Sequence, residues 1–283
     1  MKVLVTGAGG MLAAAVIPVL EADNHEVVPL RREDADVTQR GALDHALNML
    51  APDWVFHLAA FTRVDDCESD PDRAYAVNAI GSRNVTLAAV GCGAAVLTLS
   101  TDYVFDGRGQ RPYREYDASA PLSVYGASKW AGEQAIRELT PRHIVVRTAW
   151  LYGRGGHNFV DTVLHRARAG EPLRVVDDQR GSPTWAQDLA PALARLASDG
   201  QFGTFHVTNS GDCTWWDLAS YVVRRAGLTT TVEKTSTREL GRPAARPAYS
   251  VLNNQLYERA TGQRMAHWQD AADRYLSTRS RPD

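Results

Sequence analysis

Short runs of β-branched and other apolar residues alternate with longer stretches of helical periodicity in the first half of the chain. The apolar runs fall at residues 2–6, 25–30, 53–60, 94–100 and 143–151. Helical patterns separate them, notably over residues 11–20, 72–92 and 125–139. This alternation predicts a parallel sheet with helices packed on it, the doubly wound, Rossmann-type α/β fold class.

The pattern changes after residue 153, where a glycine-rich turn precedes shorter elements. We expect residues 1–153 to form a dinucleotide-binding domain. Residues 154–283 would mainly form a smaller α/β substrate-binding lobe, with a short strand at 173–176. Residues 185–209 read as one further αβ unit that returns to the main sheet.

A glycine-rich turn connects the first strand to the first helix. Gly7, Gly9 and Gly10 lie in this turn, and Met11 and Leu12 open the helix. Glycines let the backbone approach a pyrophosphate closely, and the helix N-terminus presents free N–H groups and a positive dipole end to it. The alternative is a plain glycine turn in a βα unit. The position of this glycine turn directly after a buried first strand favours nucleotide binding.

Composition and charge exclude several classes of function. The net charge is −2 with dispersed basic residues, which argues against a nucleic-acid partner. Cys67, Cys92 and Cys213 are too far apart for a zinc motif or a disulfide framework, so we expect reduced thiols in the cytoplasm. Pro18 is expected to interrupt the first helix, so the N-terminus reads as neither a signal peptide nor a membrane span. A monomer and a homodimer both stay open.

Tyr125 and Lys129 are separated by three residues and can share one helical face. A tyrosine with a pKa of about 10 exchanges protons poorly at neutral pH unless a nearby cation stabilises its phenolate. Lys129 can supply that cation. The alternative is a packed tyrosine beside a solvated lysine.

Four motifs together resemble the extended short-chain dehydrogenase/reductases, and within them the dTDP-4-dehydrorhamnose reductase family. The motifs are Thr-Gly-Ala-Gly-Gly at 6–10, Leu-Ala-Ala at 58–60, Ser-Thr-Asp-Tyr-Val-Phe-Asp-Gly at 100–107 and Tyr-Gly-Ala-Ser-Lys at 125–129. The runs at 147–153, 158–159, 177–184 and 246–250 extend the resemblance over essentially the whole chain.

The resemblance implies reduction of the C4 ketone of a dTDP-4-keto-6-deoxyhexose. Tyr125 would protonate the oxygen, Lys129 would hold the nicotinamide ribose and lower the tyrosine pKa, and Thr101 would hydrogen-bond the carbonyl. Related dehydratases usually carry an acidic residue directly after the Thr-Asp pair. Tyr103 stands there in this chain, which favours simple reduction over dehydration.

The second strand ends in Arg31 and Arg32 rather than in an acidic residue. Guanidinium groups suit a ribose 2′-phosphate, so we expect NADPH as the cofactor. The alternative is that both arginines are simply solvated, in which case NADH stays possible. Ala13 replaces the third family glycine. The expected cofactor contacts are Gly7, Gly9, Gly10, Met11, Leu12, Arg31, Asp36, Val37, Ala59, Ala60, Thr62, Asn78, Ser100, Tyr125 and Lys129.

The expected substrate contacts are Thr101, Tyr103, Trp150, Asn158, Arg180 and Arg246. The sequence fits Trp150 equally well as a substrate contact and as a core aromatic residue. Trp215 and Trp216 are expected to pack their helix against the rest of the lobe. His57 lies inside a buried strand and reads as a core histidine. We expect no metal, because Ala15 stands where some family members carry an acidic metal ligand.

Two other functions stay open. One is reduction of a different dTDP-deoxysugar, because the shared motifs do not report which sugar face meets the nicotinamide. The other is a non-catalytic NADP-binding regulatory subunit, although such relatives often lose the catalytic trio. Thr101, Tyr125 and Lys129 are all present here.

Overall fold

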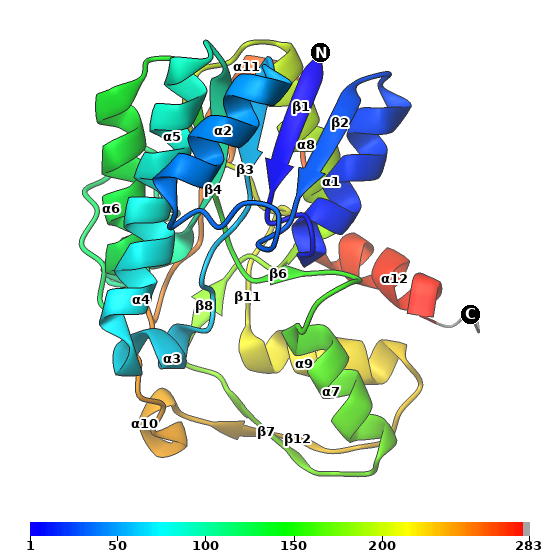
Figure 1. Cartoon of the computed structure of the whole chain (residues 1–283). Helices are drawn as coiled ribbons and strands as arrows, with labels where there is room; N and C mark the ends of the chain where they lie inside the picture. Colours follow the sequence, from blue (N-terminus) through cyan, green and yellow to red (C-terminus); the bar gives the residue numbers. More distant parts are fainter. Residues whose placement is uncertain (280–283) are drawn as a thin grey trace.

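In the computed structural model, which describes residues 1–279, a sheet of six parallel strands forms the centre of the molecule (Figure 1). Its strand order is β10-β5-β4-β3-β1-β2. The strands are β1 (Lys2–Thr6), β2 (Glu26–Leu30), β3 (Trp54–His57), β4 (Ala95–Thr101), β5 (His143–Thr148) and β10 (Gly203–His206). The order reverses between β1 and β3, where doubly wound sheets bind ligands. The predicted fold class is confirmed.

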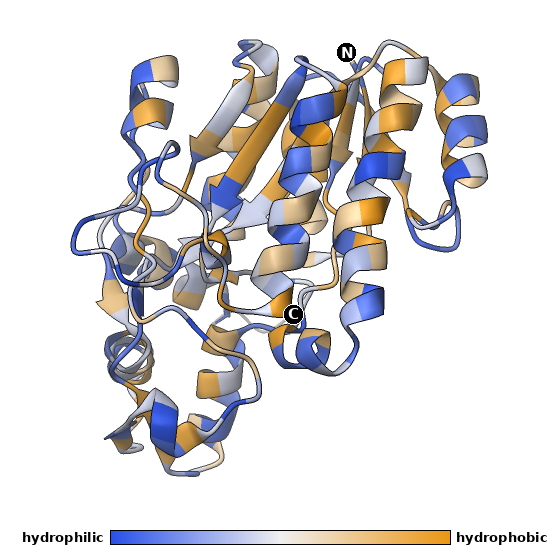
Figure 2. Cartoon of the chain, turned by 90° about the vertical axis from the view of Figure 1, so that its left-hand side faces the viewer, coloured by the Kyte–Doolittle hydropathy of each residue, from blue (hydrophilic) through white to orange (hydrophobic). Residues whose placement is uncertain are grey.

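Helices cover both faces of the sheet, because successive strand residues point to opposite sides. Val3 and Val5 share a core with α1 and α8, whereas Leu4 packs with α2 and α5 on the other face. Figure 2 shows the strands largely hydrophobic and the helices striped with hydrophilic residues. The helices are α1 (Met11–Ala22), α2 (Arg40–Leu50), α5 (Gly81–Gly91), α6 (Val124–Leu139) and α8 (Ala186–Ser198).

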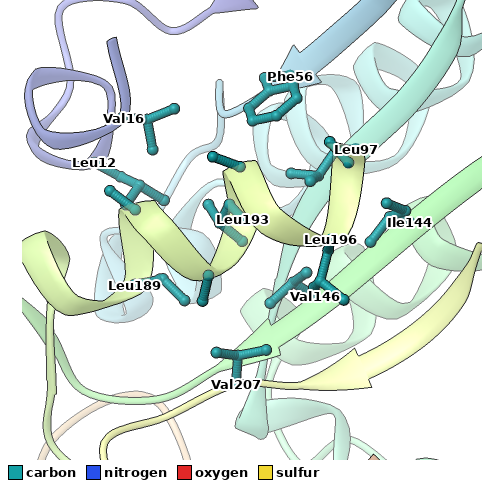
Figure 3. Close-up of a cluster of buried hydrophobic side chains, with 14 of the residues drawn as sticks. Leu12, Val16, Phe56, Leu97, Ile144, Val146, Leu189, Leu193, Leu196 and Val207 are labelled. Carbon is teal, nitrogen blue, oxygen red and sulfur yellow. The ribbon is translucent and has the colours of Figure 1, made fainter. Parts of the chain in front are cut away.

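Helix α8 fills the core on the α1 side (Figure 3). Leu193 and Leu196 are fully buried among strand residues such as Leu97 and Val146. The strand that follows, β10, pairs in parallel with β5 at the edge of the sheet. This αβ unit therefore packs on the main sheet.

The expectation that Pro18 interrupts the first helix was wrong. Helix α1 runs through it from Met11 to Ala22. Pro18 lies on the exposed side, while Val16 and Leu20 are buried against the sheet. The proline removes one backbone hydrogen bond on the solvent side, and the buried face holds the helix together.

Two expected elements are divided in the structure. The helix expected over 72–92 consists of α4 (Pro71–Tyr75), a π-helical turn η1 (Ala76–Ile80) and α5, and α3 (Val64–Ser69) precedes it. The strand expected over 143–151 ends at Thr148. Trp150 then takes a left-handed backbone conformation with φ 49°, and β6 (Leu151–Tyr152) pairs instead with β9 (Thr184–Trp185).

A second hydrophobic cluster joins the shorter elements that follow residue 153. Strand β7 spans the predicted residues 173–176 and pairs in parallel with β12. The boundary at 153/154 stays a prediction, and residues 280–283 of that predicted lobe lie outside the described chain. The elements are α7 (Phe159–Arg168), β7 (Leu173–Val176), β8 (Arg180–Gly181), β11 (Cys213–Thr214), α9 (Trp215–Arg225), β12 (Val232–Thr235), α10 (Thr237–Leu240), α11 (Gln255–Thr261) and α12 (Trp268–Arg279).

Membrane-spanning helices were also sought among the described residues. None of those helices is both long and apolar enough to cross a bilayer.

Candidate functional site

A cavity of about 610 Å³ lies at the carboxyl ends of β1, β3, β4 and β5, where the strand order predicts a ligand site. Many of the residues singled out in the sequence meet there. They are Gly7, Gly10, Met11, Leu12, Ala60, Thr62, Ser100, Thr101, Tyr103, Tyr125, Lys129, Trp150, Asn158 and Arg246.

The glycine turn at one end of the cavity has the geometry that a dinucleotide pyrophosphate needs. Gly7 has φ 69°, and a Cβ there would lie 2.6 Å from the Ala59 nitrogen. A Cβ at Gly9 would meet no atom within 4 Å, so this stretch of backbone is open to a ligand. Gly10 is the N-cap of α1, and no side chain of the described residues caps it. The first-turn N–H groups are therefore available to phosphate oxygens.

Three buried hydroxyl groups on the cavity wall have no hydrogen-bond partner among the described residues. They belong to Ser100, Thr148 and Tyr152. A buried hydroxyl without a partner is costly, so its usual explanation is a ligand or water that completes the bond. The three unpartnered hydroxyl groups therefore suit a polar ligand, and the one on Ser100 is consistent with its expected contact to the cofactor.

Helix α6 carries Tyr125 and Lys129 into the cavity. The Ser123 hydroxyl caps the helix by accepting from the Gly126 N–H at 3.2 Å. A Cβ at Gly126 would lie 2.2 Å from the Tyr103 carbonyl oxygen, so only glycine lets α6 approach the short η2 turn (Asp102–Val104) this closely. The Tyr125 phenol thereby comes within hydrogen-bonding reach of the Thr101 hydroxyl.

Burial dominates the protonation of the pair. It raises the Tyr125 pKa above the ordinary value, and the hydrogen bond with Thr101 offsets only part of this effect. The net lowering expected from Lys129 is therefore not found. Burial lowers the Lys129 pKa to about 8, against the opposing influence of the Glu133 carboxylate. At neutral pH the phenol keeps its proton and most of the lysine is charged, which is the state that an acid beside a cation requires.

The hydroxyl of Thr101 also contacts its own turn. It donates to the Asp102 carboxylate at 3.1 Å and accepts from the Tyr103 N–H at 3.2 Å. The Tyr103 ring meets the Tyr125 ring edge to face, with centroids 5.7 Å apart. Asp102 lines the cavity too, although no sequence motif predicts a role for it.

Asn78 lies behind the cavity wall. Its amide accepts from the Phe61 N–H at 2.8 Å and donates to the Phe61 carbonyl and the Ser128 hydroxyl. It therefore links the loop after β3 to α6. His57 is also internal, bonded to the Thr6 and Ser82 hydroxyls, and its pKa is lowered to about 3 by burial, as a core histidine requires.

Five other expected cofactor residues do not line the cavity. The Arg31 side chain is 66% exposed and lies 3.9 Å from Glu33. The Asp36 carboxylate accepts from Thr38 and from Arg32. The remaining three are Gly9 in the open turn, Ala59 against Gly7, and Val37 buried beside Gly81.

Two of the expected substrate residues face the cavity with their polar groups already engaged. Asn158 caps α7 by accepting from the Asp161 N–H, and its NH₂ group donates to the Gly153 carbonyl. Arg246 forms a two-point ion pair with Asp65, with both nitrogen–oxygen distances at 3.0 Å. Arg180 does not line this cavity, and its guanidinium pairs with Asp212.

Trp150 stacks on Trp215, for which the sequence predicts only a role in helix packing. Trp215 lines the main cavity and a second one of about 320 Å³, so that assignment was incomplete. Trp216 does pack, with its indole N–H donating to the Val232 carbonyl. The sequence could not distinguish the cavity-lining Trp215 from the packed Trp216, because the two are adjacent at the start of α9. The two cavities share Tyr103, Phe159, Trp215 and Arg246 in their walls. The second cavity is also lined by Arg166, Arg174, Gln179 and Arg242.

Comparisons with known proteins agree with this site. The family model described as RmlD substrate binding domain matches residues 1–280. A dTDP-4-dehydrorhamnose reductase of Streptomyces griseus is 43% identical, covering 95% of this chain and 90% of that protein. A dTDP-4-keto-6-deoxy-D-glucose reductase of Streptomyces niveus is 37% identical, covering 95% and 94%.

Among solved structures, dTDP-4-dehydrorhamnose reductase from Bacillus anthracis in complex with NADP superimposes with a TM-score of 0.95. It is 37% identical, and the match covers 98% of this chain and 99% of that one. The resemblance drawn from the motifs is therefore confirmed, and the chain belongs to the RmlD substrate binding domain family.

Proposed function

We propose that this chain catalyses the NADPH-dependent reduction of the C4 ketone of dTDP-4-dehydro-6-deoxy-L-mannose to dTDP-L-rhamnose. The observation that carries this function is the convergence of Thr101, Tyr125 and Lys129 on one cavity, beside the uncapped N-terminus of α1. The S. griseus relative, at 43% identity, bears the name of this activity.

The side chains have separable roles in this reaction. When bound, NADPH supplies the hydride that the ketone carbon receives. Tyr125 gives its phenol proton to the oxygen that becomes negative, and Thr101 hydrogen-bonds the same oxygen. The Lys129 ammonium stabilises the phenolate that remains. The raised pKa of Tyr125 keeps its phenol protonated before the reaction.

The nucleotide diphosphate would occupy the second cavity. The paired indoles of Trp150 and Trp215 offer an aromatic surface to the sugar or the base. Arg166, Arg174 and Arg242 each pair with a carboxylate in this structure and would supply positive charge suited to phosphate oxygens. Arg246 lies where the two cavities meet, so it stays our candidate for contact with the diphosphate.

A second candidate is a 4-ketoreductase for another dTDP-deoxysugar, which the S. niveus relative supports. The regulatory NADP-binding alternative ranks lower, because all three catalytic side chains line the cavity. A cytoplasmic location and a monomeric or homodimeric state stay predictions.

The Tyr125→Phe variant distinguishes a catalytic protein from a non-catalytic NADP-binding regulatory subunit. We expect the wild-type protein to oxidise NADPH when dTDP-4-dehydro-6-deoxy-L-mannose is generated in situ. The variant should bind NADPH normally while turnover falls by roughly 10²–10⁴-fold, the usual contribution of a general acid. Unchanged turnover would remove Tyr125 from the mechanism, and no turnover by the wild type would favour the alternatives.

A further inference from the structure

Asp102 is a carboxyl group buried beside the reacting centre. Only 2% of the residue is exposed, yet it borders the main cavity. One oxygen accepts from Thr101 at 3.1 Å, and the other accepts from the Ser250 hydroxyl at 2.5 Å. Asp102 thus connects the end of β4 to a chain segment almost 150 residues away.

That segment is fixed by its own backbone bonds. Ser250 donates its N–H to the Arg180 carbonyl, and Arg180 donates its N–H to Ala248, both at 2.8 Å. The Ser250 hydroxyl is therefore presented to Asp102 from a defined position. Ser250 is itself 1% exposed, so water does not compete for this bond.

The hydrogen bonds of Thr101 create a conflict with its catalytic role. A hydroxyl has one hydrogen and two lone pairs. The Tyr103 N–H uses one lone pair, the Tyr125 phenol lies within hydrogen-bonding reach of the other, and the hydrogen is directed at Asp102. While the carboxylate holds this hydrogen, Thr101 has none left to donate to a ketone oxygen.

We propose that Asp102 is a positioning residue that decides whether the single hydrogen of Thr101 points at the carboxyl or at the substrate ketone. A protonated Asp102 donates its own hydrogen to the second lone pair of Thr101 and accepts from Ser250 through its other oxygen. The Thr101 hydrogen is then released to the ketone, and the Tyr125 phenol turns its hydrogen from Thr101 to the same ketone oxygen. An ionised Asp102 captures it. This inference rests on the proposed ketone reduction.

The surroundings of Asp102 allow it to change charge near neutrality. Burial raises its pKa to about 7, while the bonds from Ser250 and Thr101 act in the opposite direction. The titratable groups that face it among the described residues are Tyr103 in its own turn and Tyr125 on α6. Both have raised pKa values and stay neutral, so neither competes in this pH range. Ser250, which faces it from the distant segment, does not titrate.

The direction of the pH dependence follows from these charges. Below pH 7 Asp102 is protonated and Thr101 can donate to the ketone. As pH rises through about 7, the carboxylate forms and kcat/KM should fall. Lys129 loses its proton near pH 8, which adds a second fall. Wild-type kcat/KM should thus drop about 20-fold between pH 6 and pH 8.

Asp102→Asn tests the proposal, because asparagine permanently resembles the protonated acid. Its NH₂ can donate to Thr101 while its oxygen accepts from Ser250. We expect kcat/KM of this variant to fall only about twofold from pH 6 to pH 8, since only the Lys129 step remains. A profile that superimposes on the wild type would overturn the proposal, as would a folded, NADPH-binding variant that is inactive at every pH.

Ser250→Ala provides a second test outside the reacting groups. Loss of its bond should raise the Asp102 pKa further and move the first fall to higher pH. An unmoved fall would count against Asp102. Infrared spectroscopy gives a readout without turnover: a carboxylic-acid band that titrates near pH 7 and is missing in Asp102→Asn. If that band is found but no ketosugar is reduced, the proposed function is wrong, whereas the conclusion that Asp102 is protonated below pH 7 stands. If the band is absent, the proposal is overturned.

Discussion

The indole of Trp150 stacks on that of Trp215, with ring centroids 3.6 Å apart and 7° between the ring planes. Trp150 holds this position with a positive φ of 49°, which is rare for a bulky residue. Gly181 leaves the space, because a Cβ there would lie 2.5 Å from the indole. Strain of this kind is retained where the surrounding structure enforces it, often at binding sites.

Trp215→Ala should therefore weaken substrate binding. Stacking on an aromatic side chain contributes about 1–3 kcal/mol, so we expect KM for the dTDP-sugar to rise roughly 10-fold. NADPH affinity should be unchanged, and Trp215→Phe should recover most of the loss. Trp216→Ala is the matched control, because Trp216 lines neither cavity. Equal KM changes in the two alanine variants would contradict a role for the stack.

Lys129 sets the alkaline limit of activity. Its pKa is lowered to about 8, so the ammonium that stabilises the Tyr125 phenolate is lost as pH rises through 8. With the Asp102 step below it, the slope of log kcat/KM against pH should approach about −2 above pH 8. Lys129→Arg keeps a charge at all these pH values and should reduce the slope to about −1. A wild-type profile that stays flat to pH 9 is the result that would refute this assignment.

Arg147 and Glu133 form an ion pair in the interior, and each side chain is 1% exposed. The guanidinium donates to both carboxylate oxygens, at 3.0 and 2.9 Å. Removing Arg147 takes two of the three arginine hydrogen bonds from the buried Glu133 carboxylate and leaves only the contact with Arg137, so Arg147→Ala should lower the free energy of unfolding by about 3–5 kcal/mol. Arg137 pairs with the same carboxylate but is partly exposed. In denaturant titrations Arg137→Ala should cost much less, and equal losses would argue against burial as the cause.

Arg31 should recognise the 2′-phosphate of NADPH. Its side chain is exposed at the end of β2 and is only loosely paired with Glu33. Arg31→Ala should raise KM for NADPH about 10-fold and leave KM for NADH nearly unchanged, because only NADPH carries the extra charge. Arg32→Ala is the comparison, since Arg32 is held by Asp36. Parallel changes for both cofactors would show that the arginine acts on something other than the phosphate.

Local signals in the sequence carried much of the fold and of the cofactor end of the site. The strand periodicity, the turn at Gly7 and the spacing of Tyr125 and Lys129 depend on neighbouring residues, which a pattern can report. Pro18 misled the prediction because tertiary burial of α1 outweighed a local helix-breaking preference.

The substrate end depended on contacts between distant parts of the chain. Asp65 meets Arg246 across 181 residues, and Ser250 meets Asp102 across 148. Periodicity and spacing hold no information about such pairs, because the fold alone brings them together. The stack on Trp215 was missed for the same reason, since it needs the turn at Trp150 that ends β5 early.

The most direct test of the central claim is a comparison of two ketosugars with purified wild-type protein and NADPH. Rates would be followed by NADPH absorbance and products identified by NMR. We expect dTDP-4-dehydro-6-deoxy-L-mannose to be reduced to dTDP-L-rhamnose, with kcat/KM well above that for dTDP-4-keto-6-deoxy-D-glucose. Preference for the D-glucose ketosugar, or a product other than dTDP-L-rhamnose, would contradict the assignment.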